Sequence, residues 1–223
     1  GYIQVPNRAL AAAVLVISNF MVVLDITVAN VSIPHIAGSL GVSLDQGTWV
    51  ITSYAVSEAI AVPLTGWLAM RFGAVKVYVA TMMGFCFFSL LCGMSLTLEM
   101  IVISRIGQGI CGGLLMPLAQ TLLLRLFPPD QIPKAMLLWT MTILMGPALG
   151  PNVGGIISDN LSWHWIFLIN IPIGLVCIIL GYALLAPAET PTKKVPVDKV
   201  GLGLLIFWIG SLQIMLDIGR THD

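Results

Sequence analysis

The sequence has 223 residues, of which 58% are apolar and only 9% are charged, and its formal net charge is zero. A soluble domain carries about 25% charged residues, so this chain lacks the side chains needed to cover a water-facing surface. The composition therefore excludes a soluble enzyme, a disordered chain and a nucleic-acid binder, and it indicates a polytopic membrane protein in contact with the lipid bilayer.

Seven apolar segments are long enough to cross a bilayer, which takes about 20 mostly apolar residues. Only helices and closed barrels satisfy their backbone groups in lipid, and these long runs do not alternate as barrel strands do. We therefore predict an all-α, polytopic membrane helical bundle. In chain order, the predicted spans lie at about 9–33, 47–69, 75–96, 99–124, 135–158, 163–186 and 200–219.

One linker-like stretch interrupts this series. The segment 187–199 reads PAETPTKKVPVDK and is rich in proline and charge. It divides the first six spans from the seventh, so we predict a six-helix domain at 1–186, a cytoplasmic linker at 187–199 and a seventh spanning helix at 200–223. We expect this chain to be part of a longer protein, because the seventh helix has no partner helices after it.

The placement of Lys and Arg predicts the orientation. With a cytoplasmic N-terminus, eight of the ten basic residues fall inside, Arg105 lies within a span and Arg220 lies outside. Cytoplasmic loops carry an excess of Lys and Arg, so the reverse orientation would break this rule at nearly every loop. The eight inner residues are Arg8, Arg71, Lys76, Arg125, Lys134, Lys193, Lys194 and Lys199.

Three ionisable residues, Asp25, Glu58 and Arg105, lie within predicted spans. Each costs about 2.5–3.5 kcal/mol at a helix centre, so such residues normally face a bundle interior or a water-filled cavity. At about 1.5 Å per residue, all three fall at a similar depth in the outer half of the membrane. We predict a proton-coupling site here; the alternative is a static buried ion pair that only fixes helix packing.

The fourth span carries a face that is suited to a ligand cavity. Arg105 is followed near helical spacing by Gln108, Gly112 and Met116, which gives one cation, one amide and adaptable apolar surface. We predict that these last three residues line a cavity for hydrophobic substrates. The alternative is that the methionine is ordinary apolar filler.

The fifth span carries a stripe of small residues. Gly146, Gly150 and Gly154 are four residues apart, so another helix can approach them closely. Pro147 and Pro151 share this spacing and each removes an intrahelical hydrogen bond, which bends a helix. We predict a gating or sliding contact, with tight structural packing as the alternative.

Neither a metal site nor a catalytic cluster is predicted. The four cysteines lie inside apolar runs without CxxC pairs, and the three histidines are scattered near the outer ends of spans. The loops are mostly only a few residues long. We therefore predict that the chain is not an enzyme and needs no cofactor, with protons as its coupling ion.

Several motifs in order resemble the major facilitator superfamily, and more narrowly its EmrB/QacA drug:proton antiporter family with fourteen spanning helices. LDITVANVSIP at 24–34 is similar to the first-helix signature of that family, and RIGQG at 105–109 to its fourth-helix motif. GPALGPNVGG, which runs from Gly146 to Gly155, resembles the signature associated with antiporters. The resemblance implies that Asp25 is a protonation site and that Arg105 takes part in proton transfer.

The loop after the second span departs from the pattern of the superfamily. That pattern is G-x-x-x-D-R-x-G-R, and this chain reads GWLAMRFGA. Gly66, Arg71 and Gly73 remain, whereas Met70 stands at the acidic position and Ala74 at the second basic one. The EmrB-like branch also lacks that acidic residue, so the departure favours the narrower resemblance.

The resemblance implies a function and a location. It implies an inner-membrane, proton-coupled exporter of hydrophobic toxic compounds that works by alternating access with a periplasmic adaptor protein and an outer-membrane channel. It also implies that this chain is the N-terminal six-helix domain with the first linking helix. A proton-coupled nutrient symporter and an uncoupled facilitator of the same fold remain as alternatives.

Overall fold

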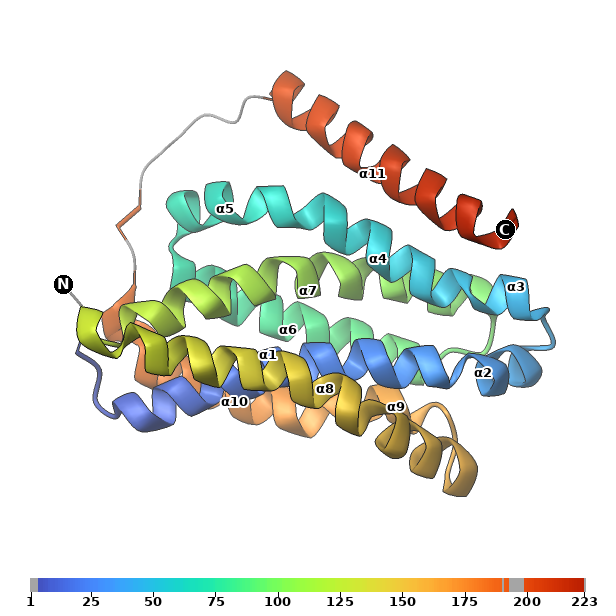
Figure 1. Ribbon diagram of the computed structural model, residues 1–223, viewed down its shortest axis with the longest axis horizontal. Helices are drawn as coiled ribbons and strands as arrows, with labels where there is room; N and C mark the ends of the chain where they lie inside the picture. The colour runs from blue at the N-terminus through green and yellow to red at the C-terminus, as the bar shows by residue number, and fades with distance from the viewer. Residues whose placement is uncertain (1–3, 190, 193–198, 223) are drawn as a thin grey trace.

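The computed structural model describes residues 4–189, 191–192 and 199–222, and each regular element among them is a helix. Most of these helices run side by side along one long axis (Figure 1). Five are long and apolar enough to cross a membrane, which confirms the predicted all-α membrane bundle. They are Arg8–Val31, Ala74–Gly93, Leu98–Arg125, Pro129–Asn160 and Trp165–Ala188.

The first span is helix α1, Arg8–Val31. It begins where the Asn7 side chain accepts a hydrogen bond from the Leu10 amide at 3.1 Å, which caps one of the free N–H groups of the first turn. After Ser32 the chain forms two further short helices, α2 (Ile33–Leu40) and α3 (Leu44–Gly47). The connection to the second span is therefore helical, which its proline and glycine content did not indicate.

The second span is interrupted. It consists of α4 (Trp49–Ala61), a 3-10 turn at Val62–Leu64 and α5 (Thr65–Phe72). Pro63 lies in this turn, and a proline lacks the backbone N–H that a continuous helix needs there. The predicted single helix at 47–69 is therefore two helices that meet at Pro63.

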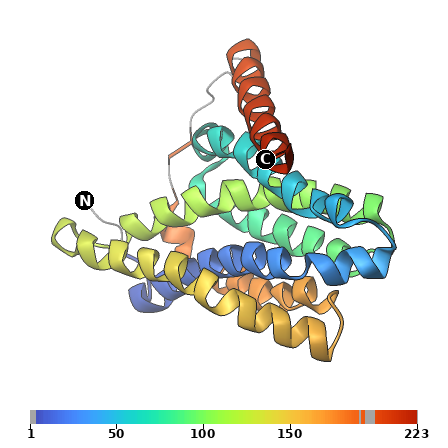
Figure 2. The ribbon, with the colours of Figure 1, turned by 45° about the vertical axis from the view of Figure 1, so that its right-hand side comes forward.

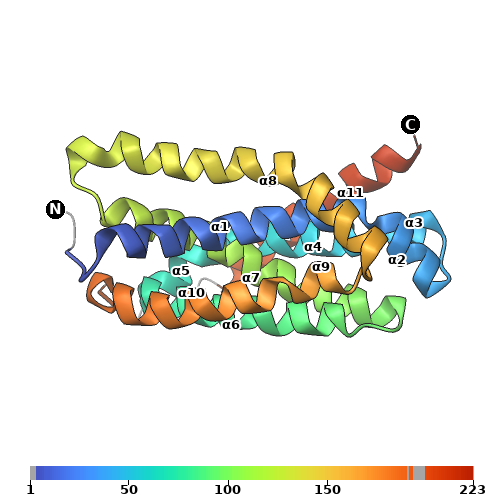
Figure 3. The same cartoon turned by 90° about the horizontal axis from the view of Figure 1, so that it is seen from below.

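Helices α6 (Ala74–Gly93) and α7 (Leu98–Arg125) form the third and fourth spans. The fifth span, α8, runs from Ile132 to Asn160 with two prolines inside it, and Figure 3 shows its C-terminal part turning away from the direction of its first part. The sixth span consists of α9 (Trp165–Leu168) and α10 (Asn170–Leu185).

The first three spans and the next three form two three-helix halves, and the middle span of each half packs against the other half. Helix α4 packs mainly against α7, whereas α8 packs mainly against α1 (Figures 1 and 2). Helix α1 therefore lies between α8 and α10, as Figure 3 shows. Helix α6 packs against α7 and α10 on the other side.

Helix α11, Lys199–His222, occupies the range of the predicted seventh helix. It lies beside α4, apart from the other long helices (Figure 1). The Cα of its Gly210 faces Ile60, so that a Cβ at Gly210 would be 3.4 Å from the Ile60 side chain. Much of the predicted linker at 187–199, including Lys193 and Lys194, lies outside the described residues.

Two apolar clusters make up the core. One surrounds Leu15, Tyr78 and Leu118, and the other surrounds Val28, Ile101 and Phe167 at the opposite end of the helices. Between them lies a set of buried polar side chains, which include Asp25, Ser89, Arg105, Gln108 and Asn170. Buried polar groups persist only where they bond to one another, so this layer is the natural place to look for function.

Candidate functional site

An ion pair between α1 and α7 lies at the centre of the polar layer. The Arg105 Nη1 lies 2.8 Å from the Asp25 Oδ2, and both side chains are only 1% exposed. Removing one partner of such a pair leaves an uncompensated buried charge, which costs about 3–5 kcal/mol. The structure thus brings together two of the three ionisable residues that the sequence places within spans.

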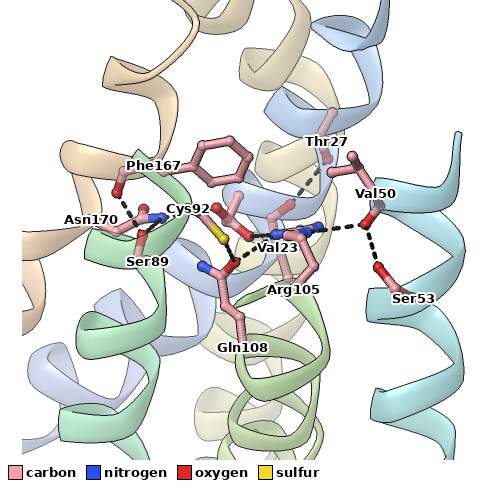
Figure 4. A network of polar contacts seen from close by, with 11 residues as sticks. Val23, Thr27, Val50, Ser53, Ser89, Cys92, Arg105, Gln108, Phe167 and Asn170 are labelled. Carbon is pink, nitrogen blue, oxygen red and sulfur yellow. Dashed lines mark hydrogen bonds and ion pairs between the residues drawn. The ribbon is translucent and has the colours of Figure 1, made fainter. Parts of the chain in front are cut away.

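The second oxygen of the same carboxylate has its own donor. The Asn170 side-chain amide donates to the Asp25 Oδ1 at 2.9 Å and to the Ser89 Oγ at 3.2 Å. The Ser89 hydroxyl in turn donates to the backbone carbonyl of Phe167 at 2.5 Å. Figure 4 shows Ser89 and Asn170 side by side on α6 and α10. These bonds hold the Asn170 amide in one orientation, with one N–H on the carboxylate and the other on the Ser89 hydroxyl.

Arg105 has four further partners. Its Nε donates to the backbone carbonyl of Val50 at 3.2 Å, and its Nη1 donates to the Gln108 Oε1 at 2.8 Å. Its guanidinium lies 4.2 Å from the ring centroid of Tyr54 and 5.6 Å from that of Phe167. Since these contacts do not involve Asp25, they can keep the guanidinium in place when the carboxylate is neutral.

Two buried polar atoms beside this pair have no hydrogen-bond partner among the described residues: the Tyr54 Oη and the Gln108 Nε2. The Tyr54 hydroxyl packs directly on Gly112, where a Cβ would overlap it. A buried donor without a partner is costly. The site therefore has spare hydrogen-bonding capacity for water or for a rearranged side chain.

Glu58 does not join the ion pair. It lies one turn after Tyr54 on α4 and is half-buried. Its backbone packs closely on Gly113 of α7, because a Cβ at Gly113 would be 2.6 Å from the Glu58 carbonyl oxygen. Within the described part of the chain, Arg105 forms its only ion pair with Asp25. A proton-coupling role for Glu58 thus stays a prediction that this geometry does not support directly.

The residues predicted to line a substrate cavity lie among packed helices. Gln108 and Gly112 are buried, the first by Arg105 and the second by Tyr54, and Met116 packs partly against the apolar core. The cavity role of these residues stays a prediction.

The glycine stripe of α8 faces α1. A Cβ at Gly146 would overlap Val23, one at Gly150 would overlap Thr27, and one at Gly154 would lie 2.7 Å from Val31. Gly155 differs, because its Cβ would meet nothing within 4 Å. The stripe thus allows close contact between the two helices, while Pro147 and Pro151 lie exposed on other faces of α8.

The loop motif holds a feature that the sequence pattern did not indicate. Gly73 has a φ of 97°, a backbone conformation that residues other than glycine rarely adopt. The carboxylate of Glu189 fills the space that a Cβ on Gly73 would occupy. The Glu189 oxygens accept hydrogen bonds from the amides of Val75 at 2.9 Å and Lys76 at 3.0 Å. Gly66 has open space around its Cα, and Arg71 is exposed.

Comparison with known proteins gives a consistent result. The description "Major Facilitator Superfamily" belongs to the family model that matches residues 15–215. The multidrug export protein EmrB of Escherichia coli K12 is 51% identical over 209 residues, which cover 94% of this chain and 41% of that protein. The fatty acid resistance protein FarB of Neisseria gonorrhoeae is 50% identical over 204 residues, which cover 92% of this chain and 40% of that protein.

The chain thus spans about two fifths of the length of the curated relatives that it matches. Among solved structures, a peptide transporter POT in complex with sulfate matches with a TM-score of 0.73 over 94% of this chain and 45% of its own. At 17% sequence identity, that likeness establishes the fold alone.

Proposed function

The chain belongs to the Major Facilitator Superfamily, and on that premise we propose that it forms the N-terminal half of a proton-coupled exporter of hydrophobic, toxic compounds. Members of this family are transporters, so the chain is not an enzyme. The single observation that carries the proposal is the fully buried Asp25 carboxylate, which is paired with Arg105 between α1 and α7.

Asp25 carries the proton in this proposal. When it is ionised, its charge is balanced by Arg105 and its second oxygen is bonded to Asn170. When a proton arrives, the carboxyl group becomes neutral and the attraction between α1 and α7 weakens, whereas Arg105 keeps its bonds to Val50 and Gln108. The two protonation states therefore favour different positions of α1.

Alternating access follows from that difference. Two six-helix halves rock about a site near the midplane, and the close contact of α8 with α1 allows these helices to shift against one another. A proton that moves inward across a membrane potential of 100 mV releases about 2.3 kcal/mol of free energy. Exchange of that proton for an outgoing substrate stores the energy in the substrate gradient.

The proposal includes a location and partners. The chain sits in a bacterial inner membrane with a cytoplasmic N-terminus, which agrees with the distribution of its Lys and Arg residues. The similarity to EmrB and FarB supports hydrophobic small molecules as cargo, and a periplasmic adaptor protein and an outer-membrane channel as partners.

The test uses the full-length protein purified in detergent and measures proton release when a hydrophobic drug is added. We expect the wild type to release protons on drug binding and the Asp25→Asn variant to release none. Asp45→Asn makes the same chemical change on exposed α3 and is the matched control, with wild-type release. Glu58→Gln tests the second carboxylate in the same assay.

Three outcomes contradict the proposal. Normal proton release by Asp25→Asn would show that this carboxylate is not the proton carrier. Proton uptake together with substrate in vesicles would indicate a symporter. Substrate flux that persists unchanged when an uncoupler collapses the proton gradient would indicate a facilitator.

A further inference from the structure

A cavity of about 400 Å³ lies between α1 and α8 at the end of the bundle that carries the basic residues. Its rim bears two cations, Arg8 at the start of α1 and Lys134 at the start of α8. The small side chains of Ala9, Ala12 and Ala13 also line it. The cavity is thus basic at its mouth and apolar inside.

The two rim cations have no acidic partner in the described part of the chain. The Arg8 guanidinium instead lies 5.3 Å from the ring centroid of Phe127, which also lines the cavity. This contact holds the guanidinium at the mouth without neutralising its charge. Two cations that line the same cavity favour an anionic ligand.

A second cavity adjoins the first. A cavity of about 390 Å³ between α1 and α10 shares Ala13 and Ile17 with the first and is lined by apolar residues throughout. Their lining residues on α1 end at Ile17, about two helical turns before Asp25. They are therefore separate from the ion-pair site, and they open on the outer surface of the described helices.

We propose that these two adjoining cavities together bind one anionic phospholipid. Its phosphate lies between Arg8 and Lys134, and its two acyl chains lie on either side of the ridge formed by Ala13 and Ile17. Basic pockets between spanning helices on the cytoplasmic side suit anionic headgroups, and two adjoining apolar cavities fit the two chains of a phospholipid. A free phosphate ion would leave both apolar cavities without an occupant.

The experiment is photocrosslinking of the full-length protein in phosphatidylethanolamine vesicles that contain a minor fraction of phosphatidylglycerol with a diazirine in one acyl chain. Labelled peptides are mapped by mass spectrometry. We expect labelling within 9–17 of α1 and at 172–180 of α10. The Arg8→Gln/Lys134→Gln variant should lower it about 25-fold, at about fivefold for each cation removed.

Three further variants make the result specific. Arg8→Lys/Lys134→Arg keeps both charges and should keep most of the labelling, which separates loss of charge from loss of folding. Ala13→Trp places a large side chain in the space of both cavities and should abolish labelling while the charges remain. Lys76→Gln removes one cation from the same end of the bundle but lines a different cavity, and it should leave labelling within 9–17 unchanged.

Unchanged labelling in the Arg8→Gln/Lys134→Gln variant would overturn the proposal. So would equal labelling by a diazirine phosphatidylcholine, because that lipid is zwitterionic and the rim would then select no charge. Displacement of the labelled lipid by inorganic phosphate would also contradict it, since the cavities would then belong to a soluble anion.

Discussion

Arg105 is the residue on which the buried polar contacts converge. It links α7 to α1 through Asp25, to α4 through the Val50 carbonyl and the Tyr54 ring, and to α9 through the Phe167 ring. Because the residue is 1% exposed, bulk solvent does not screen its charge when a partner is lost. Either charge, Arg105 or Asp25, therefore destabilises the folded protein if the other is removed.

Removing one charge should cost more than removing both. We expect Arg105→Gln to destabilise the folded protein by about 3–5 kcal/mol, because it leaves the Asp25 carboxylate buried and unpaired. The Asp25→Asn/Arg105→Gln double variant should recover most of that loss, yet remain inactive in drug-induced proton release. Thermal unfolding in detergent measures the stability of the single and double variants, and the proton-release assay measures their activity. Equal destabilisation of the single and double variants would contradict a coupled pair.

The sequence singled out Asp25, Arg105 and Gln108, but not the other residues around the ion pair. Asp25 and Arg105 stand out because a charge in an apolar run is expensive and must have a reason. Asn170, Ser89 and Tyr54 carry no charge, and polar residues of this kind are common in membrane helices, so only the spatial arrangement shows that they belong to the site. A lone asparagine within the apolar run WHWIFLINIPIG was the one available signal.

Among the elements, α8 is distinctive because it packs against the bundle mainly through one face. That face carries Gly146, Gly150 and Gly154 and lies on α1, whereas large apolar side chains such as Leu144 and Ile156 are exposed on its other faces. A helix that is held mainly by one face has few other contacts to repack when it moves. This agrees with a role in the proposed movement of the two halves.

Two glycines of α8 provide a matched pair for testing that role. Gly150→Ala should destabilise the protein by about 1–3 kcal/mol and slow transport, because its Cβ overlaps Thr27. Gly155→Ala, which meets open space, should change stability by less than about 1 kcal/mol and leave transport intact. Thermal unfolding and drug efflux from cells measure the two effects. Similar behaviour of the two variants would show that the close contact is unimportant.

Element boundaries were predictable where the hydrophobic runs are continuous, and less so elsewhere. The runs of α6 and α7 follow from length and apolar content alone. The break at Pro63 and the short helices α2 and α3 depend on backbone hydrogen bonding and on capping, such as the Ser43–Gln46 capping box, which segment hydropathy does not report. Hydropathy therefore located the spans, and local chemistry decided their ends.

At the scale of the whole molecule, the end of the sixth span is tied back to the start of the third. Glu189 follows α10 and its carboxylate accepts hydrogen bonds from Val75 and Lys76 at the N-terminus of α6. An anion at that position also interacts favourably with the helix dipole. The contact spans 114 residues of sequence and joins the two three-helix halves at the end that carries the loop motif.

Loss of this contact should be visible at single amides. We expect Glu189→Ala to cost about 1 kcal/mol, on the scale of a lost helix cap, and to accelerate hydrogen exchange of the Val75 and Lys76 amides. The Met100 amide is capped by the Thr97 hydroxyl at 3.2 Å and serves as the internal control, with unchanged exchange. Unaltered exchange at Val75 and Lys76 would contradict a capping role.

Helix α1 touches both the charge pair and the glycine stripe, and it does so with different faces of the same backbone. Asp25 points to α7, while its near neighbours Val23 and Thr27 rest against α8. Because α1 is one rigid helix, a displacement of Asp25 also moves Val23 and Thr27 against the glycines of α8. No chain of intermediate side chains is needed to connect protonation with helix movement.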